Sequence, residues 1–379
     1  MTPKIYWRPR SVSLPALFLI AILAMIGFYS VQNFPMRVNT EYYKEQMKAS
    51  NLALVAMEAV RDERVKLNPH FVNSVDPAHS GLLGSSMTPI TSEVGSLIAK
   101  RTSVNANFAA VLVLLLRNAG VKDGDAVAVG ISSSFPALNI CLYAAMSTMH
   151  LKPIIISSSS ASQWGANNPD LTWIDMERIL YQKDIFPFRS VLTTLGSKGD
   201  IGKGLSPEGR DLLVKAVERN GLPLFEPENL QDDIRRRMEI YQHSGVPIAA
   251  YINIGGGTAS TGVNIGKEWF KTGVNTQLPR GIRKNPSVMR RFLEQGIPVI
   301  NMRNARALAR RYGLPIDPTV IPAVGEGRIY YYYRSNPMLA GGILAAIILC
   351  LCAVIRSEWG FRIFGRSSAG VDDSPTQMV

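Results

Sequence analysis

Two long apolar runs without charged side chains lie near the two ends of the chain. They cover residues 14–31 and 338–355, and each is eighteen residues long. A helix of about 20 apolar residues is long enough to cross the hydrocarbon core of a bilayer. We therefore expect one transmembrane helix near each end of the chain.

The first run has an alternative interpretation as a cleaved signal peptide, because Lys4, Arg8 and Arg10 give it a basic start. Two observations favour an anchor that stays. The run is longer than the roughly 7–15 residues of a signal-peptide core, and residues 32–35 (Gln-Asn-Phe-Pro) do not form a small-residue cleavage site. The sequence favours a signal-anchor.

Basic residues in the short outer flanks predict the orientation, because positive charge is retained in the cytoplasm. These residues are Lys4, Arg8, Arg10, Arg356, Arg362 and Arg366. Both flanks, residues 1–13 and 356–379, are therefore predicted to be cytoplasmic, with residues 32–337 outside the cell in the plasma or inner membrane. Arg328 and Arg334 weaken this prediction at the second helix. Four tyrosines at 330–333 suit a membrane interface, and a strand is equally compatible with them.

Between the two apolar runs, short buried strands alternate with amphipathic helices. The predicted strands are 125–131, 153–157, 190–195, 248–254 and 297–301, and the predicted helices are 107–119, 136–149, 171–182, 208–220, 229–243, 288–295 and 304–312. Such alternation is typical of an α/β fold, a mostly parallel sheet with helices on both faces. We predict a doubly wound core over residues 101–337, preceded over residues 32–100 by a stalk helix (42–66) and a loop.

Loops rich in Ser and Gly follow three of the predicted strands, at residues 130–136, 157–163 and 255–261. The carboxyl ends of parallel strands share one edge of a sheet, so these loops should meet at one crevice. Backbone N–H groups and hydroxyls there would suit an anion. The binding candidates are Ser133, Ser134, Ser158, Ser159, Ser160, Gly255, Gly256, Gly257, Thr258 and Ser260. The alternative is that these residues only form tight turns and caps.

Ser132 is the one candidate catalytic residue. Gly130-x-Ser132-x-Ser134 is close to the G-x-S-x-G motif of serine hydrolases, with Ser in place of the final Gly. A serine nucleophile needs a base. The four histidines, which are His70, His79, His150 and His243, do not lie in a suitable loop. A non-enzymatic role is therefore favoured over a Ser132-dependent hydrolase or acyltransferase.

The formal net charge of +12 is concentrated in one region. Residues 267–334 hold thirteen Lys or Arg and four acidic residues, an excess of nine positive charges. Within this block we single out Arg283, Lys284, Arg290 and Arg291 as binding candidates. Such a block attracts phosphate groups, anionic membrane lipids or a polyanionic polymer, and the alternative is a solvated helix face. Nucleic acid is not an expected partner.

The sequence gives no support for a metal or a cofactor. Cys350 and Cys352 lie within the second apolar run, so the domain holds only Cys141 and no internal disulfide. The His and Cys residues lack ligand spacing, and the 255–261 loop lacks the Gly-Lys-Ser/Thr of a P-loop.

Four stretches of the sequence together resemble the family called poly-γ-glutamate system proteins. They are WRPRSVSLPAL (7–17), TSVNANFAAVLVLLLRNAGV (102–121), VAVGISSSFPALN (127–139) and KPIIISSSSASQWGANNP (152–169). The resemblance implies an accessory role in bacterial poly-γ-glutamate (capsule-type polymer) synthesis. It also implies as partners an integral-membrane subunit and an ATP-dependent ligase of the synthase. It supplies no catalytic residue.

Three functions are compatible with these observations. The leading one is a membrane-anchored accessory protein that binds or guides poly-γ-glutamate on the outer face of the membrane. The alternatives are a hydrolase or γ-glutamyl transferase that acts through Ser132, and a structural brace of the synthase. An enzyme requires a histidine or an acid near Ser132. A polymer binder requires the basic residues of 267–334 to line a groove near the three loops, and a brace requires neither.

Overall fold

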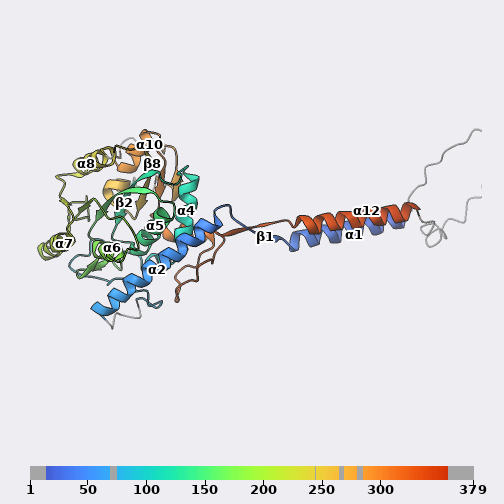
Figure 1. Cartoon of the computed structure of the whole chain (residues 1–379), viewed down its shortest axis with the longest axis horizontal. Coiled ribbons are helices and arrows are strands. Elements are labelled where there is room, and N and C mark those ends of the chain that lie inside the picture. Colours follow the sequence, from blue (N-terminus) through green and yellow to red (C-terminus); the bar gives the residue numbers. More distant parts are fainter. Residues whose placement is uncertain (1–13, 69–74, 244, 264–268, 280–284, 357–379) are drawn as a thin grey trace, which may run out of the picture. The chain divides into compact units, whose positions relative to one another are not determined.

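A seven-stranded sheet forms the centre of residues 40–330 in a computed structural model (Figure 1), which describes residues 14–68, 75–243, 245–263, 269–279 and 285–356. The strand order is β7-β6-β3-β2-β8-β10-β9. The strands are β2 (Ala126–Ser132), β3 (Lys152–Ser158), β6 (Leu192–Thr194), β7 (Leu224–Phe225), β8 (Ile248–Ile254), β9 (Gly273–Asn275) and β10 (Val299–Asn301). All pairings are parallel except that of β9 with β10. The predicted α/β class with a mostly parallel sheet is confirmed.

Helices cover both faces of this sheet (Figure 1). On one side lie α2 (Tyr43–Leu67), α4 (Phe108–Asn118), α5 (Pro136–Thr148) and α6 (Trp173–Gln182), and on the other α8 (Leu230–Gln242) and α10 (Val288–Glu294). The apolar stripes of α8 and α10 pack on the sheet, as Tyr241 and Phe292 do against Tyr251 of β8. The remaining elements of the domain are α3 (Leu97–Ser103), α7 (Pro207–Arg219), α9 (Thr258–Thr261), α11 (Ala305–Tyr312), β4 (Asn167–Asn168) and β5 (Leu171–Thr172).

The order of the strands places a switch point between β2 and β8. From β2 the chain moves outward through β3, β6 and β7, and then returns to the other side of β2 to form β8. In open α/β sheets, ligands bind at the carboxyl ends of the strands where the order reverses in this way. The topology therefore favours a ligand site at the loops that follow β2, β3 and β8.

Helix α2 corrects the prediction of a stalk. The helix forms where the sequence predicts it, but it packs against α4 and α5 and is a layer of the domain. Four of its eight buried residues are small, namely Ala49, Ser50, Ala53 and Ala56, and each of the four is completely buried. Small side chains let neighbouring helices approach closely, which explains how so polar a helix belongs to the core.

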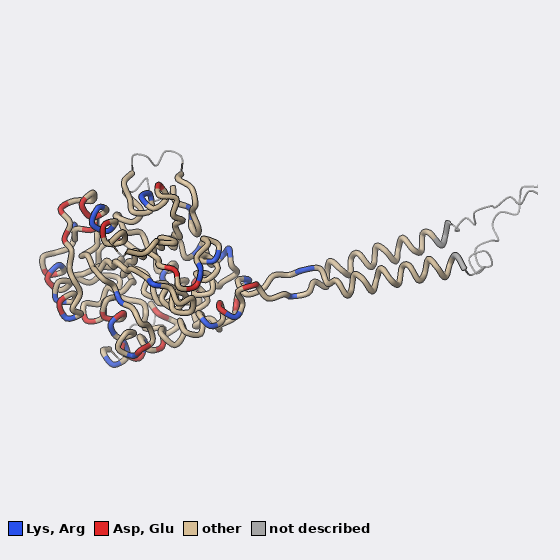
Figure 2. Tube along the Cα trace, turned by 45° about the horizontal axis from the view of Figure 1, so that its top comes forward, with Lys and Arg blue, Asp and Glu red and all other residues tan. Residues whose placement is uncertain are grey.

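A separate unit contains the two ends of the described chain: α1 (Leu14–Asn33), β1 (Met36–Asn39), β11 (Tyr331–Arg334) and α12 (Pro337–Arg356). Strands β1 and β11 pair antiparallel, so three of the four consecutive tyrosines belong to a strand. Residues 337–354 of α12 are long and apolar enough to cross a membrane, and α1 contributes a shorter apolar stretch, Leu17–Asn33. Figure 2 shows both helices almost free of charged residues. They contact each other where Gly27 faces Ile343.

Candidate functional site

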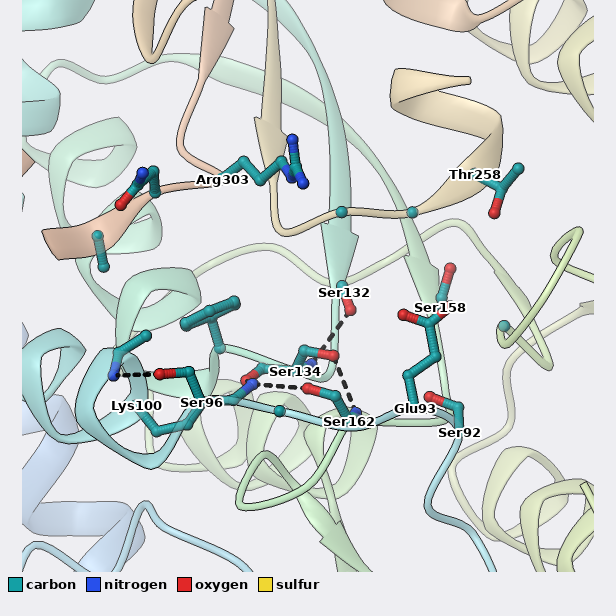
Figure 3. A pocket seen from close by; sticks show the side chains of 18 of the residues that line it. Ser92, Glu93, Ser96, Lys100, Ser132, Ser134, Ser158, Ser162, Thr258 and Arg303 are labelled. Atoms are coloured by element: carbon teal, nitrogen blue, oxygen red, sulfur yellow. Dashed lines mark hydrogen bonds between the residues drawn. The ribbon is translucent and has the colours of Figure 1, made fainter. Parts of the chain in front are cut away.

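The loops that follow β2, β3 and β8 meet at one crevice of about 620 Å³ (Figure 3). Predicted residues that line it are Ser132, Ser134, Ser158, Ser160, Gly256, Gly257 and Thr258, and Ser162 lies beside them. The crevice opens at the carboxyl edge of the sheet, at the switch point. The structure thus brings together the three loops that the sequence singled out.

Four other predicted residues stabilise these loops without lining the crevice. The Ser133 hydroxyl donates to the backbone carbonyl of Ser158 (2.6 Å) and is completely buried. Ser159 and Ser260 are hydrogen-bonded to the buried hydroxyls of Thr193 (2.9 Å) and Tyr251 (2.7 Å), respectively. Gly255 has a positive φ of 93°, and a Cβ there would lie 2.9 Å from the Cβ of Ser132. The position therefore requires glycine.

Close contact between two of the loops depends on Gly165. A Cβ at this position would lie 2.8 Å from the Cα of Ser134, so a side chain there would push the loops apart. Two hydrogen bonds join the same loops: the Ser162 N–H donates to the Ser134 hydroxyl (3.0 Å), and the Ala166 N–H donates to the Ser133 carbonyl (2.9 Å). The positions of Ser134 and Ser162 are therefore fixed relative to each other.

Lys100 of α3 lines the crevice but lies outside the loops and the basic block that the sequence singled out. Its side chain is only 2% exposed, and its amine donates to the Ser162 hydroxyl (2.8 Å) and to the Ser134 carbonyl. The amine also lies 3.9 Å from the centre of the Phe135 ring, a cation–π distance. Burial lowers the pKa of Lys100 to about 7, because the ammonium form loses its hydration. A lone lysine in a short helix carries no sequence signal for such a position.

The basic block does not form one continuous groove in the described part of the chain. Two residues of this block, Arg303 and Arg306, line the crevice. Arg303 follows β10, and Arg306 lies in α11. Arg290 and Arg291 instead pair with Glu294 on α10, and Arg291 lines a separate hollow beside α8. Arg283 and Lys284 lie outside the described residues. The predicted binding roles of Arg290 and Arg291 therefore find no support at the crevice.

Ser132 lacks the base that a catalytic serine needs. Its hydroxyl accepts a hydrogen bond from the Ser134 N–H (3.2 Å), and no histidine or carboxylate among the described residues is hydrogen-bonded to it. His79, His150 and His243 are exposed and do not line the crevice, and His70 lies outside the described residues. The geometry gives no support to a nucleophile at Ser132.

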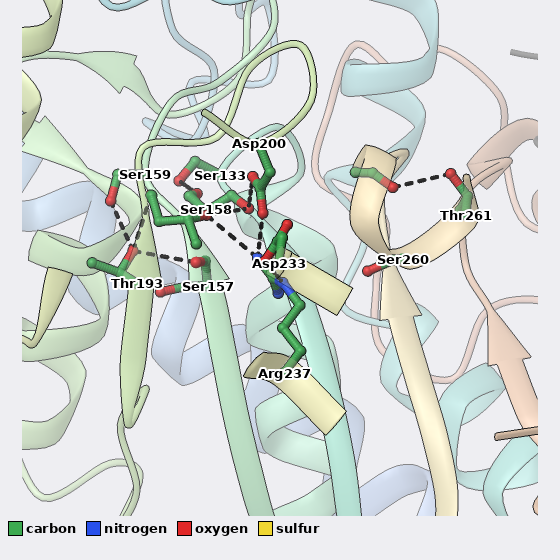
Figure 4. A network of polar contacts seen from close by, with 12 residues as sticks. Ser133, Ser157, Ser158, Ser159, Thr193, Asp200, Asp233, Arg237, Ser260 and Thr261 are labelled. Carbon is green, nitrogen blue, oxygen red and sulfur yellow. Dashed lines mark hydrogen bonds and ion pairs between the residues drawn. The ribbon is translucent and has the colours of Figure 1, made fainter. Parts of the chain in front are cut away.

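A buried ionic cluster adjoins the crevice (Figure 4), and its Asp200 also belongs to the crevice lining. Arg237 of α8, 2% exposed, pairs with Asp233 (2.7 Å) and Asp200, and Asp200 accepts a hydrogen bond from the Ser158 hydroxyl (3.1 Å). Burial raises the pKa of Asp233, and the neighbouring Asp200 adds to this while Arg237 opposes it. The cluster connects α8 to Asp200, in the segment after β6, and through it to Ser158 at the end of β3.

The crevice thus combines hydroxyl-rich loops, two arginines and a buried lysine at the switch point of a doubly wound sheet. Its lining includes two carboxylates, Glu93 and Asp200, of which Asp200 is paired with Arg237.

Comparison of the chain with protein-family models, curated proteins and solved structures found no match.

Proposed function

We propose that this chain is a membrane-anchored accessory protein of poly-γ-glutamate synthesis or export that holds a segment of the polymer in the crevice. The observation that carries the proposal is the presence of Arg303 and Arg306 beside the hydroxyls of three loops. Poly-γ-glutamate has one carboxylate per residue, and arginine binds carboxylates with two parallel hydrogen bonds. Serine hydroxyls supply further donors.

The balance of charge in the crevice supports an anionic ligand. Asp200 is paired with Arg237, and Glu93 is the other acidic residue among the described residues that line the crevice with Arg303 and Arg306. A volume of about 620 Å³ corresponds to a small-molecule site. We therefore expect the crevice to hold only a few residues of the polymer at a time.

We expect the full-length chain in detergent micelles to bind poly-γ-glutamate of defined length, with an affinity that falls as salt is raised. Arg303→Ala and Arg306→Ala should each weaken binding roughly tenfold at low salt, because a charge-assisted hydrogen bond is lost. Fluorescence anisotropy of end-labelled polymer over a salt series measures this.

Arg310→Ala is the matched control, because Arg310 lies on α11 with Arg306, is exposed and does not line the crevice. Its affinity should equal that of the wild type. Equal losses in all three variants would show that only the overall charge matters. No binding at any salt concentration would exclude the polymer-holding role and favour the structural brace.

We further propose that α1 and α12 both cross the membrane and that residues 40–330 lie outside the cytoplasm. Support comes from the contact of α1 with α12 at Gly27 and from the exposure of large apolar side chains, such as Phe18 (70%) and Met338 (87%). Protease added to intact spheroplasts should then digest the domain and spare an epitope fused before residue 1. Protection of the domain until the spheroplasts are lysed would reverse the orientation.

A further inference from the structure

The contact between Lys100 and Ser162 has the form of a serine–lysine catalytic pair. We propose that Ser162 is a nucleophile and Lys100 its general base, so that the crevice cleaves or transfers an amide or ester carbonyl group. The two side chains are 2.8 Å apart, within the distance required for direct proton transfer, and both line the crevice.

The surroundings of Lys100 hold its amine in place. The Ser134 carbonyl and the Phe135 ring contact it from the loop after β2, and Ser162 contacts it from the loop after β3. No carboxylate among the described residues forms an ion pair with it. A lysine of this kind loses its proton readily, because burial disfavours the ammonium form and no anion compensates.

Ser162 is the one crevice serine whose hydroxyl is bonded to such a base in the described part of the chain. Ser132 has no base, as shown above. The Ser158 hydroxyl reaches a carboxylate, but that carboxylate, Asp200, is already engaged by Arg237. Ser134 supports the pair from both sides: its hydroxyl accepts from the Ser162 N–H, and its carbonyl accepts from Lys100. We assign Ser134 a positioning role.

The reaction follows from these contacts. The Ser162 oxygen attacks the carbonyl carbon while its proton passes to the neutral amine of Lys100. The C–N or C–O bond of the substrate then breaks, and the leaving group takes that proton from Lys100. Water, or a second amine, attacks the resulting ester and gives one proton to Lys100, which returns it to the Ser162 oxygen. The products are a carboxylic acid, or a new amide, and a free serine.

The substrate class rests on the proposed function. Arg303 and Arg306 line the crevice together with Ser162, so the favoured substrate carries a carboxylate on the carbon bonded to the amide nitrogen, a few bonds from the reacting carbonyl carbon. A γ-linked glutamyl amide has this arrangement. The pair would then shorten the polymer or attach it to an amine.

The test uses the full-length chain in detergent micelles with a fluorophosphonate probe, which forms a covalent bond with activated serines. We expect mass spectrometry to find the label on Ser162, none in Ser162→Ala, and labelling at least 100-fold slower in Lys100→Arg. Lys100→Arg keeps a positive charge but cannot act as a base. Ser147→Ala and Lys152→Arg, which change residues outside the crevice, should label like the wild type.

A second assay separates this inference from the proposed function. Polymer length and affinity are followed together in the wild type and in Ser162→Ala, a change that removes a single oxygen atom. Binding in both proteins, with shortening or amine transfer only in the wild type, supports the pair. Polymer binding without labelling of Ser162, or equal labelling in Lys100→Arg, would overturn the pair and leave the holding role intact. Labelling of Ser162 without polymer binding would retain the pair and overturn the holding role.

Discussion

Arg237→Met is expected to lower the free energy of unfolding by about 3–5 kcal/mol, because it leaves two buried carboxylates without their cation. Asp233 is completely buried, and Asp200 is 3% exposed. Methionine fills much of the volume of the arginine but donates no hydrogen bond. Because a protonated carboxyl group needs no counter-charge, the loss should become smaller as the pH falls.

Urea unfolding of the full-length chain in mild detergent, followed by the near-ultraviolet circular dichroism of buried aromatic residues, measures this loss. Arg235→Met is the matched control: it makes the same substitution on α8, where Arg235 is exposed and pairs with Asp232 and Glu239. The control should change stability little. A similar small change in Arg237→Met would mean that the cluster is solvated in solution.

The second large effect is a pH dependence of stability caused by Lys100. Burial lowers its pKa in the folded chain to about 7, against an ordinary value of 10.5. Between these values the unfolded chain binds a proton that the folded chain does not. The wild type therefore gains stability as the pH rises, by up to about 1.4 kcal/mol per pH unit. In Lys100→Met this contribution is absent.

The quantity to measure is the free energy of unfolding of the wild type minus that of Lys100→Met, from urea curves at pH 7 to 10.5. It should rise by about 4–5 kcal/mol across this window. Lys152→Met, which changes an exposed lysine at the start of β3, is the control. The free energy of unfolding of the wild type minus that of Lys152→Met should not change over the same pH range. A flat difference for Lys100 would show that the amine stays charged in the folded chain and would remove it as a base.

The central strands could be predicted because parallel strands covered on both faces are nearly continuous apolar runs. Strands β2, β3 and β8 are such runs, and each lies within a residue or two of the predicted bounds. Strand β9 was missed because it has three residues, starts at a glycine and owes its conformation to the neighbouring β10. The pairing of β9 with β10 depends on the tertiary structure and cannot be predicted from the local sequence.

The interpretation of α2 as a stalk failed for a different reason. Half of the buried residues of α2 are three alanines and a serine, and this serine, Ser50, is hydrogen-bonded to Tyr330 (2.7 Å). Alanine is common on exposed and buried helix faces alike. Only the positions of α4 and α5 identify the face that is covered.

One part of the candidate site could be predicted from the sequence, and another part could not. Loops that follow neighbouring parallel strands must share an edge, so the meeting of the serine-rich loops follows from the fold class. Which serine is bonded to a base does not follow, because Lys100 comes from a helix that precedes the first strand of the sheet. The sequence separation of 62 residues between Lys100 and Ser162 is closed only by the packing of the loops around Gly165.

The pairing of β1 with β11 determines how the domain of residues 40–330 is joined to the rest of the chain. Asn39 lies opposite Tyr331, so the chain leaves the strand pair and returns to it at the same rung. Residues 40–330 are therefore an insertion in a helical hairpin made of α1, β1, β11 and α12. An insertion of this kind is modular, because one domain could replace another without altering a single pairing in the hairpin that carries it.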